Sequence, residues 1–316
     1  MPDTRDAGAG GGASAAAPRH VVISGASGLI GHALTERLRA EGVRVTHLVR
    51  RPPTGPDEVE WLTSPAPLDP GVLEGADAVV GLNGASIARF PWTPSYRSTL
   101  LWSRVTPTRA LARALRELGD GAPAFLSASA SGYYGSRPGE RITEATGRGE
   151  SFLADICGEW EGAARSAGEH TRLVLLRTTA IVDRRAFLKP LIPLTKLGLS
   201  GPIGRGTQVW PWISLEDEIE AIRFLLTADI DGPVNLAGPS RATANDIGFA
   251  LARRLRRPFV LRAPEWGLKL LLGKDATEAL LTNDQDIVPE VLQRAGYTFR
   301  HPTVEQAIDA AVSEAE

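Results

Sequence analysis

The chain has very little cysteine, and Cys157 is the one thiol among its 316 residues. A single cysteine excludes an internal disulfide and is typical of a reducing compartment, so we expect a cytoplasmic protein. No run of about 18 apolar residues occurs, so the sequence predicts no segment that spans a membrane. The five histidines show no metal-ligand spacing, and we therefore expect no metal site.

An excess of charge of either sign is also absent. The chain has 35 Lys and Arg against 37 Asp and Glu, for a net charge of −2. This balance gives no global reason to expect nucleic acid or an anionic membrane as a partner. A local basic cluster stands before Pro258, and we interpret it as a solvated helix end. It consists of Arg253, Arg254, Arg256 and Arg257.

The most informative segment is VVISGASGLIG, residues 21–31, in which an apolar run leads into three glycines and then a helical pattern. Glycine permits a tight turn and leaves room for a pyrophosphate, which the following helix N-terminus attracts. The order of strand, glycines and helix predicts a dinucleotide site, whereas an ordinary glycine-rich turn is the alternative. The expected contacts come from Gly25, Ser27, Gly28, Leu29 and Ile30.

The next expected strand, residues 43–49, ends in Arg50 and Arg51, and no acid follows before Asp57. An acid at this place would hold the ribose 2′-hydroxyl of NAD, whereas a guanidinium suits the 2′-phosphate of NADP. We therefore predict NADP (NADPH), with Arg50 as the main ligand and Arg51 as its helper. The alternative is a solvated basic loop before Pro52.

Strand-like and helical runs alternate through the first two-thirds of the chain. Such alternation predicts an α/β fold, a Rossmann-type doubly wound parallel sheet with helices on both faces. The expected strands are residues 20–24, 43–49, 76–82, 124–129, 173–177 and 233–237, and the expected helices between them include 31–40, 94–118, 151–169 and 217–228.

Beyond Thr178 the composition changes. Residues 189–207 are dense in Pro and Gly and predict a long loop, and helices separated by prolines follow from Ser240 to Ala311. We expect a smaller, mainly helical and partly discontinuous substrate domain. The predicted organisation is a disordered tail at 1–18, a cofactor domain at 19–180 that regains 206–237, and a substrate domain at 181–205 and 238–313.

Several motifs together resemble the extended short-chain dehydrogenase/reductase family. They are SGASGLIG at 24–31, LNG at 82–84, SASASGYYG at 127–135 and WISLED at 212–217. GLSGPIG at 198–204 and LQRAGYTFR near the end resemble the epimerase-family branch that carries a small C-terminal domain of uncharacterised function. This likeness covers roughly residues 20–313 and implies a Rossmann domain that binds NADP and a variable substrate domain. Asn83 and Gly84 would then lie beside the cofactor.

The chain departs from the family at its usual Tyr-x-x-x-Lys pair. Leu153 occupies the tyrosine position and Cys157 the lysine position. In the family the lysine and the cofactor lower the pKa of the tyrosine, so the usual proton relay is missing here. A cysteine on an apolar stripe is more often an inert core residue than a nucleophile.

Other residues near the end of the fourth expected strand offer a replacement. Ser129, or Ser131 as the alternative, would orient a substrate carbonyl beside the cofactor, and Tyr133 or Tyr134 would donate a proton. The alternative is that Tyr134 packs under the loop and Tyr133 lines a pocket passively.

Two functions remain open at this point. The first is an NADP-dependent oxidoreductase or epimerase for a small hydroxyl or carbonyl substrate, with simple reduction favoured because the usual pair is missing. The second is a non-catalytic NADP(H)-binding sensor or scaffold. The resemblance also implies a homodimer through residues 94–118 and 151–169.

Overall fold

The computed structural model describes residues 17–313, apart from the side chains of residues 271, 272 and 274. Its centre is a seven-stranded sheet in the order β10-β7-β5-β4-β1-β2-β3, and every neighbouring pair is parallel. The predicted Rossmann-type fold is therefore confirmed. The strands are β1 (His20–Ser24), β2 (Arg44–Val49), β3 (Glu58–Glu60), β4 (Ala78–Gly81), β5 (Ala124–Ala130), β7 (Leu173–Thr178) and β10 (Gly232–Leu236).

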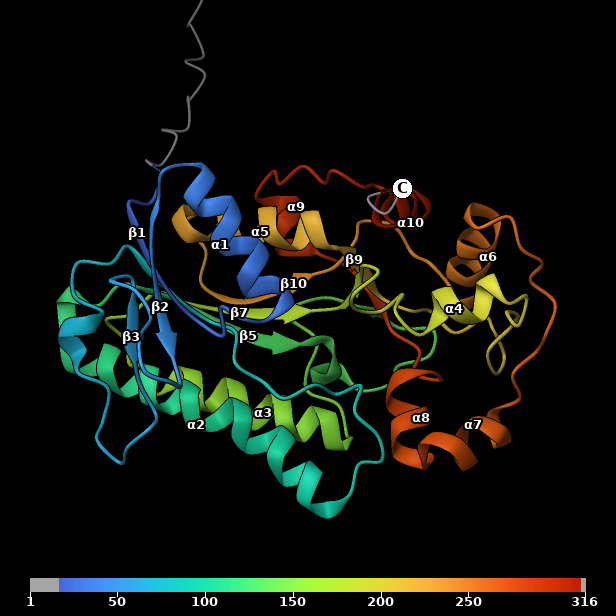
Figure 1. Cartoon of the computed structure of the whole chain (residues 1–316), viewed down its shortest axis with the longest axis horizontal. Coiled ribbons are helices and arrows are strands. Elements are labelled where there is room, and N and C mark those ends of the chain that lie inside the picture. Colours follow the sequence, from blue (N-terminus) through green and yellow to red (C-terminus); the bar gives the residue numbers. More distant parts are fainter. Residues whose placement is uncertain (1–16, 314–316) are drawn as a thin grey trace, which may run out of the picture.

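Helices cover both faces of this sheet (Figure 1). On one face lie α1 (Leu29–Ala40) and α5 (Leu215–Thr227), and on the other lie α2 (Pro94–Leu118) and α3 (Phe152–Arg165). Each face has its own apolar core, because successive side chains of a strand point to opposite sides. Phe125 belongs to the core under α2 and α3, whereas Leu126 belongs to the core under α1 and α5.

The local sequence accounts for these elements. The central strands are short apolar runs, as expected of parallel strands that are covered on both faces. On α3 the residues at three-to-four spacing, among them Ile156, Trp160 and Ala164, are buried as an amphipathic stripe. Thr93 caps α2 and Pro94 stands at its first position, which is the favoured start of a helix.

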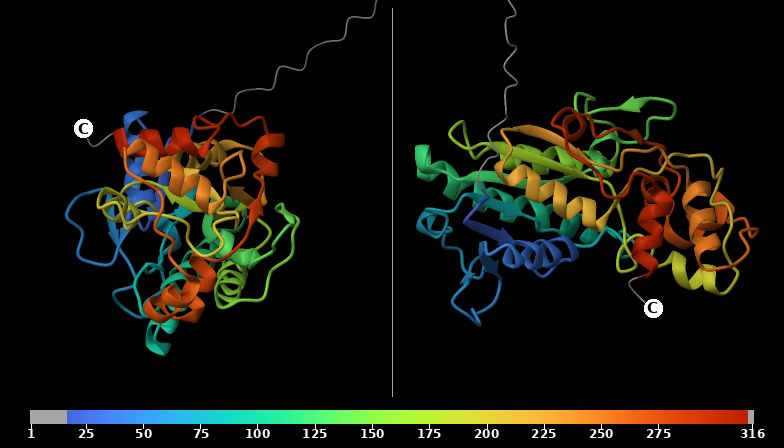
Figure 2. Two further views of the ribbon diagram at one scale, coloured as in Figure 1. Left: turned by 90° about the vertical axis from the view of Figure 1, so that its right-hand side faces the viewer. Right: turned by 90° about the horizontal axis from the view of Figure 1, so that it is seen from above.

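The C-terminal region packs at one end of the sheet (Figure 2). Several of its helices share a third apolar core with β8 and the segment of β9, to which Trp210 and Trp212 contribute, whereas Ala276 packs in a separate cluster with Trp92 and Leu100. Residues 189–207 do not form one long loop as predicted, because Leu191–Lys196 forms a short helix. The elements are β8 (Ala180–Val182), α4 (Leu191–Lys196), β9 (Trp212–Ser214), α6 (Ala244–Arg254), α7 (Glu265–Leu272), α8 (Lys274–Leu280) and α10 (Val304–Ser313).

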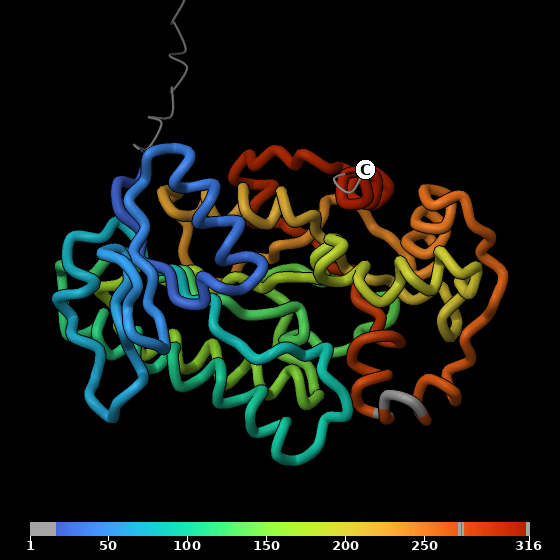
Figure 3. The backbone as a smooth tube through the Cα atoms, in the orientation of Figure 1, coloured from blue at the N-terminus to red at the C-terminus, as the bar shows by residue number. Residues whose placement is uncertain are grey.

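After α8 the chain returns to the sheet before it ends at α10 (Figure 3). On the way, β11 (Asp286–Ile287) pairs with β6 (Arg141–Ile142) in a small parallel sheet. The following helix, α9 (Glu290–Arg294), adds Leu292 to the core under α1 and α5. The tail expected at residues 1–18 lies almost wholly outside the described residues.

Candidate functional site

The turn between β1 and α1 is shaped by its glycines. Gly25 has a φ of +84°, and a Cβ there would lie 2.8 Å from the carbonyl of Leu82. A Cβ at Gly31 would lie 2.5 Å from the carbonyl oxygen of Gly25. Both positions therefore require glycine for the turn to pack.

Gly28 differs from its two neighbours. A Cβ there would meet only the Gly25 oxygen, at 3.4 Å, so the fold itself leaves room for a side chain. Gly28 is the N-cap residue of α1 and has no side chain that could bind the free amides, and the first turn of the helix holds no acid. No side-chain cap therefore pairs with the amides of Leu29 and Ile30 in the first turn of α1, and Ser27 beside them is exposed. This cradle fits a pyrophosphate.

A cavity of about 220 Å³ lies at the ends of β2 and β4 and against α2. No acid lines it, and Arg50 and Asn83 face it. The Oγ of Ser24 donates a hydrogen bond to the Oδ1 of Asn83 at 2.6 Å, which ties this side chain to the end of β1. The complete lining is Arg50, Leu62, Asn83, Trp102, Ser103, Thr106 and Pro107.

Arg51 has a different environment from Arg50. Its guanidinium makes paired hydrogen bonds to the carboxylate of Glu58 at 2.6 and 2.8 Å, and these hold the pKa of Glu58 at about 2. Among the described residues no carboxylate pairs with Arg50. Arg51 is thus paired within its own loop, although the sequence predicted that it would help Arg50 to bind the phosphate. Arg50 remains available for an anion.

Ser129 lies on the side of β5 that faces α3. It is buried, and its Oγ donates to the Oε1 of Glu161 at 2.8 Å. Glu161 in turn pairs with the guanidinium of Arg177, at 2.8 Å through Nε and 3.0 Å through Nη2. The hydroxyl expected to orient a substrate is therefore used inside a buried ion-pair network.

Tyr134 belongs to the same network. It is fully buried in a short 3₁₀ turn, Ser131–Tyr134, that follows β5. Its hydroxyl donates to the Oδ1 of Asn235 at 2.6 Å and accepts from Arg177 at 2.9 Å. Burial raises the pKa of Tyr134 to about 12, against the opposing effect of Arg177. In this structure Tyr134 anchors the turn, and its phenol does not reach open space.

Tyr133 has the remaining phenol at this edge. The Arg177 guanidinium lies over its ring, with Cζ 3.6 Å from the ring centroid. The ring also meets Tyr134 edge to face at 5.5 Å. Within the described part of the chain, no protein group forms a hydrogen bond with the Tyr133 hydroxyl. Of the three residues predicted to be catalytic, Tyr133 alone keeps its polar group free of the buried network.

The turn that carries Tyr133 rests on α3. A Cβ at Gly132 would lie 3.2 Å from the Cβ of Leu153 and 3.7 Å from the Sγ of Cys157. Cys157 is buried, and burial raises its pKa to about 12. A thiol with so high a pKa is unreactive at neutral pH, in agreement with the prediction of an inert core residue.

Arg104 is a residue near this site that sequence reasoning missed. Its guanidinium donates to the carbonyls of Leu100 at 2.9 Å and Ala85 at 3.0 Å. A Cβ at Gly84 would lie 3.0 Å from its Cζ. Burial lowers the pKa of Arg104, and Cys157 is among the groups whose charge acts on it. A half-buried cation therefore lies close enough to Cys157 for each group to affect the pKa of the other, and an arginine inside a helix gave no signal of this in the sequence.

The C-terminal region reaches the same turn through Gln285. Its Nε2 donates to the carbonyls of Ser131 at 2.9 Å and Gly135 at 2.8 Å, one on each side of the two tyrosines. The neighbouring Asp284 accepts from the amide of Val209 at 3.0 Å. This contact between distant segments was also invisible in the sequence, because nothing local marks Gln285.

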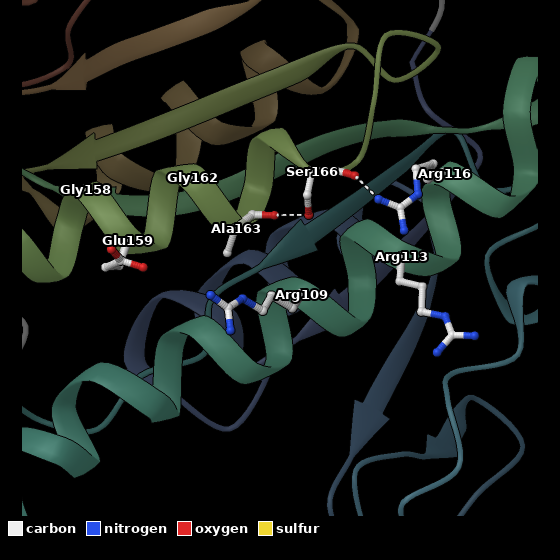
Figure 4. A pocket seen from close by; sticks show the side chains of 8 residues that line it. All are labelled: Arg109, Arg113, Arg116, Gly158, Glu159, Gly162, Ala163 and Ser166. Atoms are coloured by element: carbon white, nitrogen blue, oxygen red, sulfur yellow. Dashed lines mark hydrogen bonds between the residues drawn. The ribbon is translucent and has the colours of Figure 1, made fainter.

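A second cavity, of about 450 Å³, lies between α2 and α3 (Figure 4). In it the Nη1 of Arg116 donates to the carbonyl of Ser166 at 3.2 Å. None of its lining residues belongs to the glycine turn or to the end of β5, so it is separate from the candidate site. The homodimer expected through these two helices stays a prediction. The lining is Arg109, Arg113, Arg116, Gly158, Glu159, Gly162, Ala163 and Ser166.

Metal clusters and membrane-spanning helices are both absent from the described part of the chain. No three His, Cys, Asp or Glu side chains lie close enough together to form a metal site within residues 17–313. Over the same residues, no helix combines the length and the apolar character needed to cross a bilayer.

Comparison with known proteins identifies the family. Residues 21–237 match the model of the NAD dependent epimerase/dehydratase family, and residues 263–311 match a domain of unknown function (DUF1731). The chain therefore belongs to the NAD-dependent epimerase/dehydratase family, within the extended short-chain dehydrogenases/reductases. The resemblance inferred from the motifs is confirmed, including the small C-terminal domain.

Three relatives define its place more closely. The "Epimerase family protein MT2273" of Mycobacterium tuberculosis is 38% identical over 296 residues, which are 93% of this chain and 97% of that protein. The human epimerase family protein SDR39U1, solved with NADPH, is 27% identical with a TM-score of 0.84 and coverage of 93% and 99%. A nucleoside-diphosphate sugar epimerase from Corynebacterium glutamicum is 29% identical with a TM-score of 0.75, over 94% of this chain and 59% of that one.

Proposed function

We propose that this protein is an NADPH-dependent oxidoreductase or epimerase-like enzyme that acts on a small hydroxyl or carbonyl substrate. The observation that carries the proposal is the pairing of an open cradle at Gly28 with an acid-free cavity at Arg50. The first suits a pyrophosphate and the second a 2′-phosphate. The human relative SDR39U1, which was solved with NADPH, supports the same choice.

Bound NADPH would supply a hydride from the C4 atom of its nicotinamide ring. The amides of Leu29 and Ile30 would hold the pyrophosphate, and Arg50 would hold the 2′-phosphate. At the other end of the site, the Tyr133 hydroxyl would donate a proton to the alkoxide that forms on the substrate. Its free hydroxyl and the Arg177 cation over its ring support this assignment.

The usual Tyr-Lys pair has no counterpart at Leu153 and Cys157. We infer that Arg104 supplies the positive charge that the lysine gives in other family members, because its guanidinium stands beside Gly84 and acts on Cys157. Ser129 would act only indirectly, through Glu161 and Arg177.

The second candidate function is an NADP(H) sensor that does not catalyse a reaction. It is favoured by the inward hydrogen bonds of Ser129 and Tyr134, which leave one phenol at the reacting edge. The phosphate cradle serves a sensor as well as an enzyme. A cytoplasmic setting remains a prediction for either function.

One experiment separates the two. Purified protein would be mixed with NADPH and a panel of aldehydes, ketones and quinones while the absorbance of the reduced nicotinamide is followed. We expect oxidation with at least one compound and its loss in Tyr133→Phe, with NADPH affinity unchanged. Tyr96→Phe is the matched control, because it removes a tyrosine hydroxyl that donates a hydrogen bond to the carbonyl of Ser86. Tight NADPH binding without turnover of any compound would favour the sensor.

A further inference from the structure

Two segments of the C-terminal region contain cations and no acids. Residues 189–206 hold three Lys or Arg and residues 247–264 hold five, and neither segment has an Asp or Glu. The whole chain, by contrast, has a net charge of −2. Positive charge is therefore concentrated in these two segments.

The two segments lie side by side in the structure. The amides of Val260 and Leu261 donate to the carbonyl of Ser200 at 2.9 and 3.0 Å. The Oγ of Ser200 donates to the carbonyl of Pro258 at 3.0 Å. With α4, α6 and α7 they form the end of the molecule that faces the viewer in the left view of Figure 2. We call this surface the apolar-basic face.

The apolar-basic face exposes large apolar side chains. Leu197 is 73% exposed and Val260 69%, although apolar side chains of this size are usually buried. On α7, Trp266 and Leu270 stand one turn apart and are 74% and 84% exposed. Such a concentration of exposed apolar side chains marks an interaction surface. The other members are Leu194, Leu199, Phe249 and Leu261.

Cations border these side chains, and several have no acidic partner. Arg205 pairs with Asp284 and Arg254 with Asp309, so these two charges are compensated. A further group of cations in the two segments has no carboxylate partner among residues 17–313. This group includes Lys196, Arg253, Arg256 and Arg257. The acids that α6 and α7 add at this end are engaged, Asp246 by Thr243 and Glu265 by Lys269, so the face offers both apolar side chains and uncompensated positive charge.

We propose that the apolar-basic face docks on the surface of an anionic lipid bilayer. Leucine, valine and tryptophan side chains enter the boundary between headgroups and acyl chains, while neighbouring lysine and arginine side chains attract anionic headgroups. A nucleic-acid backbone would satisfy the cations but would leave the leucines without a partner. The near-neutral total charge does not oppose this docking, because charges beyond about 10 Å are screened at physiological salt.

The test uses the full chain and flotation with lipid vesicles. Binding is expected to vesicles of phosphatidylcholine with about one-third phosphatidylglycerol, and not to vesicles of phosphatidylcholine alone. Replacing three cations, Lys196→Gln, Arg256→Gln and Arg257→Gln, is expected to weaken binding by about one-hundredfold. The matched control replaces three exposed cations at other surfaces, Arg19→Gln, Arg39→Gln and Arg44→Gln, and should bind like the wild type.

A second variant tests the apolar contribution. Leu197→Ser with Val260→Ser is expected to abolish flotation, while NADPH affinity and the circular dichroism spectrum stay at wild-type values. Equal flotation of the wild type and both variants, or no flotation at low salt, would overturn the proposal. So would tight binding to an RNA duplex that depends on the cations and is unchanged in the serine variant.

Discussion

The glycine turn after β1 and the polar residues after β5, which we call the polar edge, lie at the same edge of the sheet. They differ in the groups that form them and in whether those groups are already paired. At the turn, backbone amides and the empty space at Gly28 form the site. At the edge, polar side chains form hydrogen bonds with one another: Ser129 donates to Glu161, and Tyr134 accepts from Arg177. A turn of this kind binds ligand with groups that the fold cannot otherwise satisfy, whereas the edge uses most of its polar groups for its own stability.

The largest effect is expected at the edge. Arg177→Met removes the buried partner of Glu161 and leaves this carboxylate with only the exposed Arg165, 3.5 Å away, so the free energy of unfolding should fall by up to about 3–5 kcal/mol. Urea unfolding followed by circular dichroism measures it. Arg51→Met, which breaks the exposed pair with Glu58, should have a much smaller effect. Equal losses in the two variants would contradict the buried network.

At the turn, the effect should fall on ligand affinity instead. Gly28→Val fills the cradle and should weaken NADPH binding on the order of 100-fold, as measured by titration calorimetry. The melting temperature should change little, because the fold leaves room for a side chain there. Gly31→Val, by contrast, collides with the backbone of Gly25 and should destabilise the folded protein. A large loss of stability in Gly28→Val would contradict the distinction between Gly28, where the fold leaves room for a side chain, and Gly31, where it does not.

A smaller effect is expected at Arg50, which we propose as the ligand of the 2′-phosphate of NADPH. Arg50→Ala removes a charged hydrogen-bonding group and should weaken NADPH binding by about 10- to 100-fold, while NADH affinity changes little. Fluorescence titration of both coenzymes measures this ratio. Arg51→Ala serves as the control, since its guanidinium is held by Glu58. Equal weakening of both coenzymes would refute the phosphate assignment.

A further effect, which depends on pH, concerns a third polar group, on α5. Burial raises the pKa of Glu218 to about 8, while a hydrogen bond from Thr178 opposes the shift. The unfolded chain releases this proton near the ordinary glutamate pKa, so stability falls as pH rises from that range to about 8. Glu218→Gln removes this fall, so between pH 5 and 8 its stability should rise relative to that of the wild type by up to about 1.4 kcal/mol for each pH unit.

Denaturant unfolding at several pH values checks this difference. Glu216→Gln, at a half-exposed position two residues earlier, should follow the wild type. A pH dependence in Glu218→Gln that equals that of the wild type would show that the folded protein does not hold the proton.

The success of the sequence predictions follows the range of the interactions. The strands and helices of the sheet, the α3 stripe and the start of α2 were predicted because neighbouring residues decide them. The strands β3, β6, β8, β9 and β11 were missed, since each has only two or three residues and depends on pairing with distant segments. The helix α4 was not predicted, because Pro193 interrupts its pattern.

The same limit applied to the candidate site. Gly25, Gly28 and Arg50 could be found because a strand, a turn and a helix in sequence fix where they lie. The orientation of Ser129 toward α3 could not, because a register change of one residue would reverse it. Arg104 and Gln285 act across 19 and more than 100 residues, and nothing in their local sequence marks such contacts.

The order of residues along the chain thus determined the strands and helices that build the sheet and the glycine turn after β1, because local patterns of residues decide these elements. The tertiary structure alone decided which hydroxyls point inward, which phenol keeps its proton accessible, and where cations gather beside exposed leucines. Those outcomes depend on how distant segments pack, and packing sets burial, hydrogen-bond partners and local charge.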